Sequence, residues 1–190
     1  MNSHLDAVIE MHKFFTRERI QYAIIGGIAV QWWGEPRFTR DIDVTILVDA
    51  DKEKKVLQKI LSHFSPRLTQ ALDFALKNRV CLVKNKQGVD IDISLGVPGY
   101  EDECMERVIL VPIQKKSAVK ICSAEDLIIH KALAGRPQDV ADIESIILRQ
   151  GKKLDVHLIR KWLKEFAFLL EKKEILEVFQ IAWKKFQRRP

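Results

Sequence analysis

The segment that most constrains the fold is DIDVTILV at residues 41–48, where acidic and apolar residues alternate. Alternate side chains of a β-strand point to opposite faces, so Asp41, Asp43 and Thr45 share one face and the apolar residues share the other. Two ionised carboxylates this close repel each other unless a cation neutralises them. Mg²⁺ takes hard oxygen ligands, typically one or two carboxylates plus substrate phosphates. The segment therefore indicates a metal–nucleotide clamp on a half-buried strand. A solvated strand face without a ligand is the alternative.

Two adjacent glycines, Gly26 and Gly27, follow a short apolar strand predicted at residues 22–25 and precede a helix predicted at 28–33. Glycine lets the backbone approach a phosphate closely, and the first turn of a helix presents free N–H groups to an anion. The pair therefore favours a phosphate site. A tight turn that only needs glycine is the alternative.

A second acidic strand is predicted in VDIDISLG at residues 89–96. Its apolar residues would face the core, whereas Asp90 and Asp92 share the opposite face. If this strand lies beside the first, one of these two aspartates completes a three-carboxylate site. Such a site holds two Mg²⁺ ions, one for the attacking hydroxyl and one for the triphosphate and its leaving pyrophosphate. A surface strand with two solvated acids is the alternative.

The pattern of the chain changes near residue 121. With 190 residues, 47% of them hydrophobic and 31% charged, the chain is long enough for one globular domain and a small helical region. We expect a mixed α/β core over residues 1–121 and a helical region over residues 122–190. The expected core strands are 22–25, 41–48, 79–84, 89–95, 107–113 and 119–121. The expected helices are 3–18, 28–33, 51–63 and 68–76, then 137–149, 155–167 and 171–187 beyond a helix that starts at 123.

The excess positive charge lies at the C-terminal end. Residues 151–190 contain 11 Lys and Arg and 5 Asp and Glu, so the remaining 21 basic and 21 acidic residues of the chain balance. Solvated helix faces are the simpler explanation. Attraction of nucleic acid or polyphosphate is the alternative. The three cysteines show no metal-ligand spacing, so we expect reduced, buried thiols and no zinc site.

Nothing in the sequence predicts a membrane partner. No apolar run approaches the length that crosses a bilayer, and the first twenty residues lack the pattern of a signal peptide. We therefore expect a cytoplasmic protein.

Taken in order, four motifs resemble the DNA polymerase beta-type nucleotidyltransferase superfamily. They are Gly26-Gly27, RFTRDIDV at 37–44, GVDIDISLG at 88–96 and SAEDLIIHKALAGRPQDVADI at 123–143. The resemblance covers about residues 20–150. It is greatest to the small prokaryotic branch, which includes abortive-infection-type toxins and many proteins of unknown substrate. It implies an α+β nucleotidyltransferase fold, a small mixed β-sheet flanked by helices and followed by a helical region.

The resemblance implies roles for residues of the acidic strands. Asp41 and Asp43 would bind the metal ions, and Gly26-Gly27 would cradle the triphosphate. Asp92, favoured over Asp90 by its position before SLG, would be the third ligand and would help to deprotonate the acceptor hydroxyl.

The resemblance also implies roles in the helical block. Lys131 and Arg136 would contact phosphates, and Asp139 would orient one of them through an ion pair. Pro137 suits the first position of a new helix. For Asp142, a similar role and a surface salt bridge are both open.

The activity implied is transfer of a nucleoside monophosphate from a nucleoside triphosphate, such as ATP, to a hydroxyl group with Mg²⁺. The acceptor would be a tRNA, a protein or a small molecule, and the basic C-terminal helices make RNA one candidate. A partner-binding component of a toxin–antitoxin pair with the same fold is the second hypothesis. The third is a metal-dependent glycosyltransferase using Asp41 and Asp43, which leaves the second acidic strand unexplained.

Overall fold

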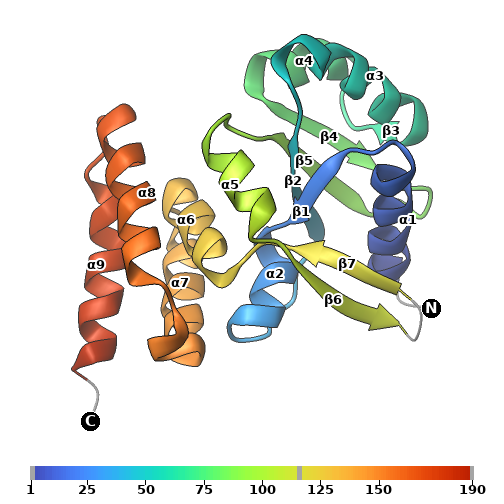
Figure 1. Ribbon diagram of the computed structural model, residues 1–190. Coiled ribbons are helices and arrows are strands. Elements are labelled where there is room, and N and C mark those ends of the chain that lie inside the picture. The colour runs from blue at the N-terminus through green and yellow to red at the C-terminus, as the bar shows by residue number, and fades with distance from the viewer. Residues whose placement is uncertain (1–2, 115–116, 189–190) are drawn as a thin grey trace. The chain divides into compact units, whose positions relative to one another are not determined.

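The computed structural model describes residues 3–114 and 117–188 (Figure 1). The chain divides into two compact units. The first consists of Met1–Gly27 and Phe38–Cys122, and the second of Ile28–Arg37 and Ser123–Pro190. The boundary falls within one helix, because the two glycines belong to the first unit and the rest of that helix to the second.

The first unit contains one mixed sheet, with seven strands among the described residues, in the order β3-β4-β5-β2-β1-β7-β6. The strands are β1 (Gln21–Ile24), β2 (Asp41–Leu47), β3 (Ser65–Pro66), β4 (Val80–Lys84), β5 (Asp90–Leu95), β6 (Ile109–Gln114) and β7 (Ser117–Ile121). The helices of this unit are α1 (Ser3–Arg17), η1 (Ala50–Lys52), α3 (Glu53–His63), α4 (Ala71–Asn78) and α5 (Tyr100–Glu106). This arrangement confirms the expected α+β class with a mixed sheet and flanking helices.

The two acidic strands are neighbours at the centre of this sheet. Strands β2 and β5 pair in parallel, with Asp41 opposite Asp90 and Asp43 opposite Asp92. On the other side of β2, β1 pairs antiparallel with it and brings Ile24 opposite Val44. Residues that are directly opposite in a sheet share a face, so the register places four carboxylates on one face of two adjacent strands.

The alternation predicted for β2 is observed. Ile42, Val44 and Ile46 are fully buried, and helix α1 covers their face of the sheet. Tyr22 lies opposite Ile46, and its ring packs against that of Phe15 with 5.2 Å between the ring centroids. The apolar face of β2 therefore lies in the core between the sheet and α1.

The acidic face of β2 is covered at one end by α5, a helix that the sequence analysis did not predict. The Thr45 hydroxyl is fully buried and donates a hydrogen bond of 3.0 Å to Oε1 of Glu101. The other carboxylate oxygen of Glu101 accepts a hydrogen bond of 2.7 Å from the backbone N–H of Val97. The carboxylates at the start of β2 remain partly exposed, so α5 limits the open part of this face to Asp41 and Asp43.

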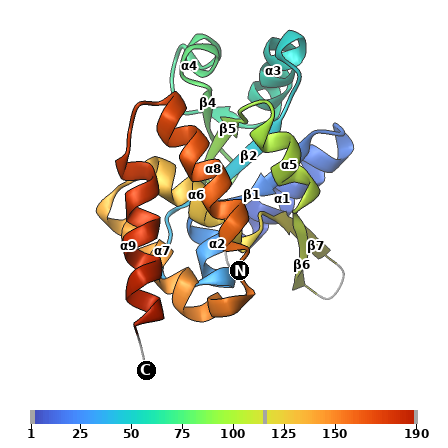
Figure 2. The same ribbon diagram turned by 60° about the vertical axis from the view of Figure 1, so that its left-hand side comes forward.

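The second unit is helical (Figure 2). It contains most of α2 (Gly26–Trp33), then α6 (Ala124–Ala134), α7 (Pro137–Gln150), η2 (Gly151–Lys153), α8 (Val156–Leu169) and α9 (Glu174–Gln187). Ser123 caps α6, since its hydroxyl oxygen accepts a hydrogen bond of 3.0 Å from the backbone N–H of Asp126. Pro137 is the first residue of α7, as predicted.

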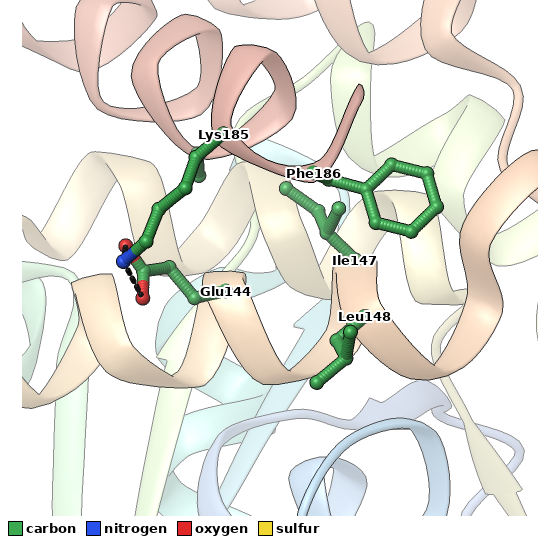
Figure 3. A pocket seen from close by; sticks show the side chains of 6 residues that line it. Glu144, Ile147, Leu148, Lys185 and Phe186 are labelled. Atoms are coloured by element: carbon green, nitrogen blue, oxygen red, sulfur yellow. Dashed lines mark hydrogen bonds and ion pairs between the residues drawn. The ribbon is translucent and has the colours of Figure 1, made fainter. Parts of the chain in front are cut away.

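The last helix is fixed to α7. Phe179 of α9 is fully buried, and Trp183 is almost so. At the surface, Nζ of Lys185 lies 3.0 Å from both carboxylate oxygens of Glu144, and Phe186 lies on the other side of the same shallow pocket (Figure 3). The last helix therefore packs on the helical unit along its apolar face, as its periodicity indicates.

Among the described residues, no helix combines the length and the apolar character that spanning a bilayer requires.

Candidate metal and nucleotide site

Asp41, Asp43 and Asp92 converge on one point of the first unit. One carboxylate oxygen from each lies within 4.8 Å of the others, and all three side chains are half-buried. Adjacent parallel strands produce this cluster, because Asp43 lies opposite Asp92 and Asp41 lies two residues earlier on the same face. The donor set is made only of carboxylate oxygens, which suits a hard divalent cation such as Mg²⁺.

Gly26 is required beside this cluster for two independent reasons. Its φ angle is +63°, a left-handed conformation that other residues adopt at a cost. In addition, a Cβ atom on Gly26 would overlap the carboxylate of Asp43. The backbone N–H of Ile25 donates a hydrogen bond of 2.9 Å to the carbonyl oxygen of Asp43, which holds the strand end and the glycine turn together. The start of α2 therefore lies directly against one of the three carboxylates.

Gly27 allows a second close approach. A Cβ atom there would lie 2.6 Å from Oγ1 of Thr39, closer than real side chains pack. The same Thr39 hydroxyl lies 3.0 Å from Oδ1 of Asp41, to which it donates a hydrogen bond. The Gly-Gly pair thus lets the helix start pack against Thr39, which in turn orients Asp41.

Arg67 is a residue of this site that the sequence analysis missed. Its guanidinium group forms an ion pair with Asp92 through Nη1, and its Nε lies 3.7 Å from Oδ2 of Asp90. Asp90 also lies 3.4 Å from Nζ of Lys84. Arg67 directly follows β3, a strand of two residues with no detectable periodicity, so the sequence carries no signal that it joins the acidic strands.

The surroundings of Asp92 shift the pKa of its carboxyl group in opposite directions. Burial raises the pKa of its carboxyl group, Arg67 lowers it, and the nearby Asp41 and Asp90 raise it further. The net pKa lies above the ordinary value for aspartate. A single arginine therefore does not fully offset burial and the clustering of acids, which leaves the site with a demand for further positive charge.

The other predicted site residues form a separate, buried cluster in the second unit. Nζ of Lys131 lies 2.9 Å from Oδ1 of Asp139 and 2.8 Å from Oδ2 of Asp142, and all three side chains are at least 95% buried. Arg136 contributes its Nε, which donates a hydrogen bond of 2.7 Å to Asp139, while its own side chain remains 72% exposed. The ion pair predicted between Asp139 and either Lys131 or Arg136 is thus observed with both cations.

Arg37 completes this second cluster and was not predicted as a member. Its Nε and Nη2 donate hydrogen bonds of 2.8 and 2.9 Å to the two oxygens of Asp142, a bidentate pair. Burial raises the pKa of Asp142, but Arg37 and Lys131 outweigh it and hold the pKa below the ordinary value. The pKa of Asp139 is lowered in the same way, because Arg136 and Lys131 outweigh its burial.

The structure therefore brings the predicted residues together in two groups. Asp41, Asp43 and Asp92 lie with Gly26 in the first unit. Lys131, Arg136 and Asp139 lie in the second unit with Asp142, for which the sequence left an ion pair or a surface salt bridge open. Asp142 is buried, so its ion pairs are not at the surface.

Comparison with solved structures supports the fold. An antigenic nucleotidyltransferase-like protein from Paracoccidioides brasiliensis aligns over 93% of this chain and 94% of its own, with a TM-score of 0.54 and 17% identity. ANT(2″)-Ia, crystallised in complex with adenylyl-2″-tobramycin, aligns over 97% and 99% respectively, with a TM-score of 0.51 and 13% identity. Both are similar to this chain in fold, and at this identity the likeness extends no further.

No curated protein sequence matches the chain significantly. A family described as nucleotidyltransferase of unknown function (DUF6036) matches residues 3–190. That match spans both units, including the acidic strands and the buried cluster on α6 and α7. The chain therefore belongs to this family of nucleotidyltransferases.

Proposed function

We propose that the protein transfers a nucleoside monophosphate from a nucleoside triphosphate to a hydroxyl group, with Mg²⁺ held by Asp41, Asp43 and Asp92. The observation that supports this most strongly is the convergence of three carboxylate oxygens within 4.8 Å on two parallel strands. Membership of a nucleotidyltransferase family agrees with it.

The residues of the cluster fit Mg²⁺ chemically. All three donors are carboxylate oxygens that lie within 4.8 Å of one another, and a divalent cation would neutralise their repulsion. When bound, Mg²⁺ supplies charge neutralisation for the triphosphate and lowers the pKa of the attacking hydroxyl. The rest of the work falls to the chain itself, which positions the reacting groups.

Each residue of the first unit has a role in this proposal. Asp92 lies within the same cluster and would help to accept the proton of the acceptor hydroxyl. Gly26 and Gly27 open the start of α2 so that its free N–H groups can receive a phosphate. Thr39 keeps the carboxylate of Asp41 in one orientation through its hydrogen bond.

The second unit contributes differently in this proposal. Among the cations of the buried cluster, Arg136 has the most exposed side chain, so we propose it as a phosphate contact. Lys131 and Asp139 form an ion pair within the buried cluster. Asp139 also accepts a hydrogen bond from the backbone N–H of Arg136, so this ion pair fixes the position of Arg136 at the start of α7. A direct contact of Lys131 with nucleotide stays a prediction.

RNA is the acceptor class that we propose to test first. Along α8, the exposed side chains of Arg160 and Lys164 lie one turn apart on the same side of the helix, and exposed Lys161 is adjacent in sequence to Arg160. Phe168, one turn further, is 82% exposed. A row of cations ending in an exposed aromatic ring is the combination that single-stranded nucleic acid uses, through its phosphates and its bases.

The proposed activity is tested with Asp43→Asn. The purified variant and the wild type are incubated with each of four α-³²P-labelled nucleoside triphosphates, Mg²⁺ and a total cell extract, and labelled products are separated by size and class. The wild type should label an acceptor, and Asp43→Asn should not, with an unchanged circular dichroism spectrum. Full activity in that variant would refute the metal assignment.

The RNA acceptor is tested with a pair of matched charge reversals. Arg160→Glu with Lys164→Glu should weaken binding to a single-stranded RNA and flatten its salt dependence. Lys54→Glu with Lys55→Glu changes the net charge by the same amount on exposed residues of α3 and should have a much smaller effect. Equal losses in both double variants would exclude a specific role for α8.

A further inference from the structure

Arg67 lies between two carboxylates that compete for it. Its Nη1 pairs with Asp92, and its Nε lies 3.7 Å from Asp90. The two acids lie on the same face of β5, two residues apart. The planar guanidinium group presents several N–H donors at fixed angles, so one arginine can bridge both.

Only the side chain of Arg67 has freedom to change partners. Its backbone N–H donates a hydrogen bond of 3.0 Å to the carbonyl oxygen of Leu82, and the preceding Pro66 pairs with Val83 of β4. The head group is half-buried beside the sheet, with 26% of the side chain exposed. A shift from Asp92 towards Asp90 therefore requires rotation about side-chain bonds alone.

A divalent cation and Arg67 would compete for Asp92. The carboxylate of Asp92 is one of the three that converge, and Arg67 is the cation paired with it among the described residues. Two cations that share one carboxylate repel each other at short range. Asp90 offers the arginine a second acceptor outside the three converging carboxylates, already within reach of Nε.

We infer that Arg67 is a displaceable internal counter-ion: it neutralises Asp92 until a divalent cation binds, and Asp90 then retains it. This inference rests on the metal site of the proposed function. It gives Asp90 a task that differs from that of Asp92, because Asp90 holds the arginine and Asp92 holds the metal ion. It also makes Arg67 a determinant of metal affinity.

The inference predicts opposite effects for two substitutions. Arg67→Gln removes the competitor, so Mn²⁺ should bind about two- to fivefold more tightly, as expected for the loss of a partly exposed ion pair. Asp90→Asn removes the second acceptor and confines Arg67 to Asp92, so Mn²⁺ should bind more weakly by a similar factor. Isothermal titration calorimetry of the nucleotide-free protein with Mn²⁺ measures both.

The double variant of Arg67→Gln and Asp90→Asn distinguishes a displaceable arginine from a simple effect of net charge on Mn²⁺ affinity. If Asp90 acts through Arg67, its substitution should lose at least half of its effect, on a logarithmic scale, in the Arg67→Gln background. Effects that simply add would overturn the inference. Lys84→Gln is the matched control, because Lys84 contacts Asp90 but not Asp92. If Lys84→Gln raised the affinity for Mn²⁺ as much as Arg67→Gln does, the inference would also be overturned.

Two further variants keep the outcome interpretable. Arg67→Lys retains the charge but lacks the planar fork, so its affinity for Mn²⁺ should lie between those of the wild type and Arg67→Gln. It replaces Arg67→Gln in the test if that variant does not fold. Asp92→Asn tests the underlying site. If Asp92→Asn binds Mn²⁺ like the wild type, the proposed metal site fails. If it loses binding while Arg67→Gln and Arg67→Lys leave the affinity unchanged, only the role of Arg67 fails.

Discussion

Asp43 of β2 and Asp92 of β5 lie directly opposite each other in a parallel pair of strands, and each contributes an oxygen to the same three-carboxylate cluster. Asp41 has the same relationship to Asp90, yet Asp90 is outside the cluster and faces Lys84 and Arg67 instead. The register therefore pairs two acids with two others, while only three of the four converge.

Substitution of the two β5 acids should distinguish them. Asp92→Asn removes a proposed metal ligand, and nucleotidyl transfer should fall at least about a hundredfold, more than the loss typical of outer-shell partners of a metal. Asp90→Asn at saturating Mg²⁺ should remain within about fivefold of the wild type. Initial rates of labelled-nucleotide transfer measure both, and the reverse order of effects would make Asp90 the third ligand.

Gly26→Ala should destabilise the first unit and disturb Asp43. Alanine meets two penalties there, the left-handed φ of +63° and the overlap of its Cβ atom with the Asp43 carboxylate. Gly88→Ala is the matched control, because φ is +81° but the space around its Cβ position is open. The control should lose about 1 kcal/mol of unfolding free energy, the usual cost of left-handed backbone. Gly26→Ala should lose clearly more in urea titrations, and equal losses would contradict the overlap.

The buried cluster should make the second unit sensitive to acid. The pKa values of Asp139 and Asp142 are lower in the folded chain than their ordinary values. Their stabilising contribution is therefore complete above the unfolded pKa of about 3.9, and it is lost as the pH falls through the lower folded value. The free energy of unfolding, measured in urea from pH 7 to pH 3, should fall over the acid end of this range.

Asp142→Asn should reduce both the stability at pH 7 and its dependence on acid pH. The substitution leaves Lys131 buried with one carboxylate instead of two and leaves Arg37 without its bidentate acceptor. Loss of one partner from a buried ion pair costs about 3 kcal/mol. If the variant were as stable as the wild type at pH 7 and lost the same stability towards pH 3, the cluster would contribute nothing to folding.

Cys81 should react with thiol reagents only after unfolding. Its side chain is fully buried, and burial raises the pKa of the thiol to about 11, so little thiolate exists at pH 8. Cys104 and Cys122 are also buried cysteines. Titration with a chromogenic disulfide should therefore be slow for all three thiols in buffer and complete in denaturant. Rapid modification of one thiol in buffer would indicate local opening.

The sequence could predict the acidic strands because their signal is local. A strand has a period of two, so alternation in DIDVTILV and VDIDISLG reveals both the buried face and the acidic face. The pairing of Asp43 with Asp92 could not be read in the same way. Register depends on which strands become neighbours, and that depends on contacts across the whole sheet.

Arg67 and Glu101 could not be predicted from the sequence, and the physical reason is the same for both. Arg67 follows a strand of two residues, and Glu101 lies on α5, a seven-residue helix rich in acids with no long apolar stripe. Elements this short are held by tertiary contacts, such as the hydrogen bond from Thr45 to Glu101, which leave no periodic pattern. Arg37 could not be assigned to the buried cluster from the sequence, because its partner Asp142 is distant in the sequence.

The parallel pairing of β2 with β5 also has a consequence for folding. Parallel neighbours cannot be joined by a tight turn, and here the connection contains α3, β3, α4 and β4. The ends of this long loop must meet before Asp92 can approach Asp43, and contacts of such large sequence separation form slowly. A chain that has folded only as far as β2 carries two of the three acids. In the proposed metal site the third acid arrives only when β5 joins the sheet, so metal binding would report that this pairing of distant strands has formed.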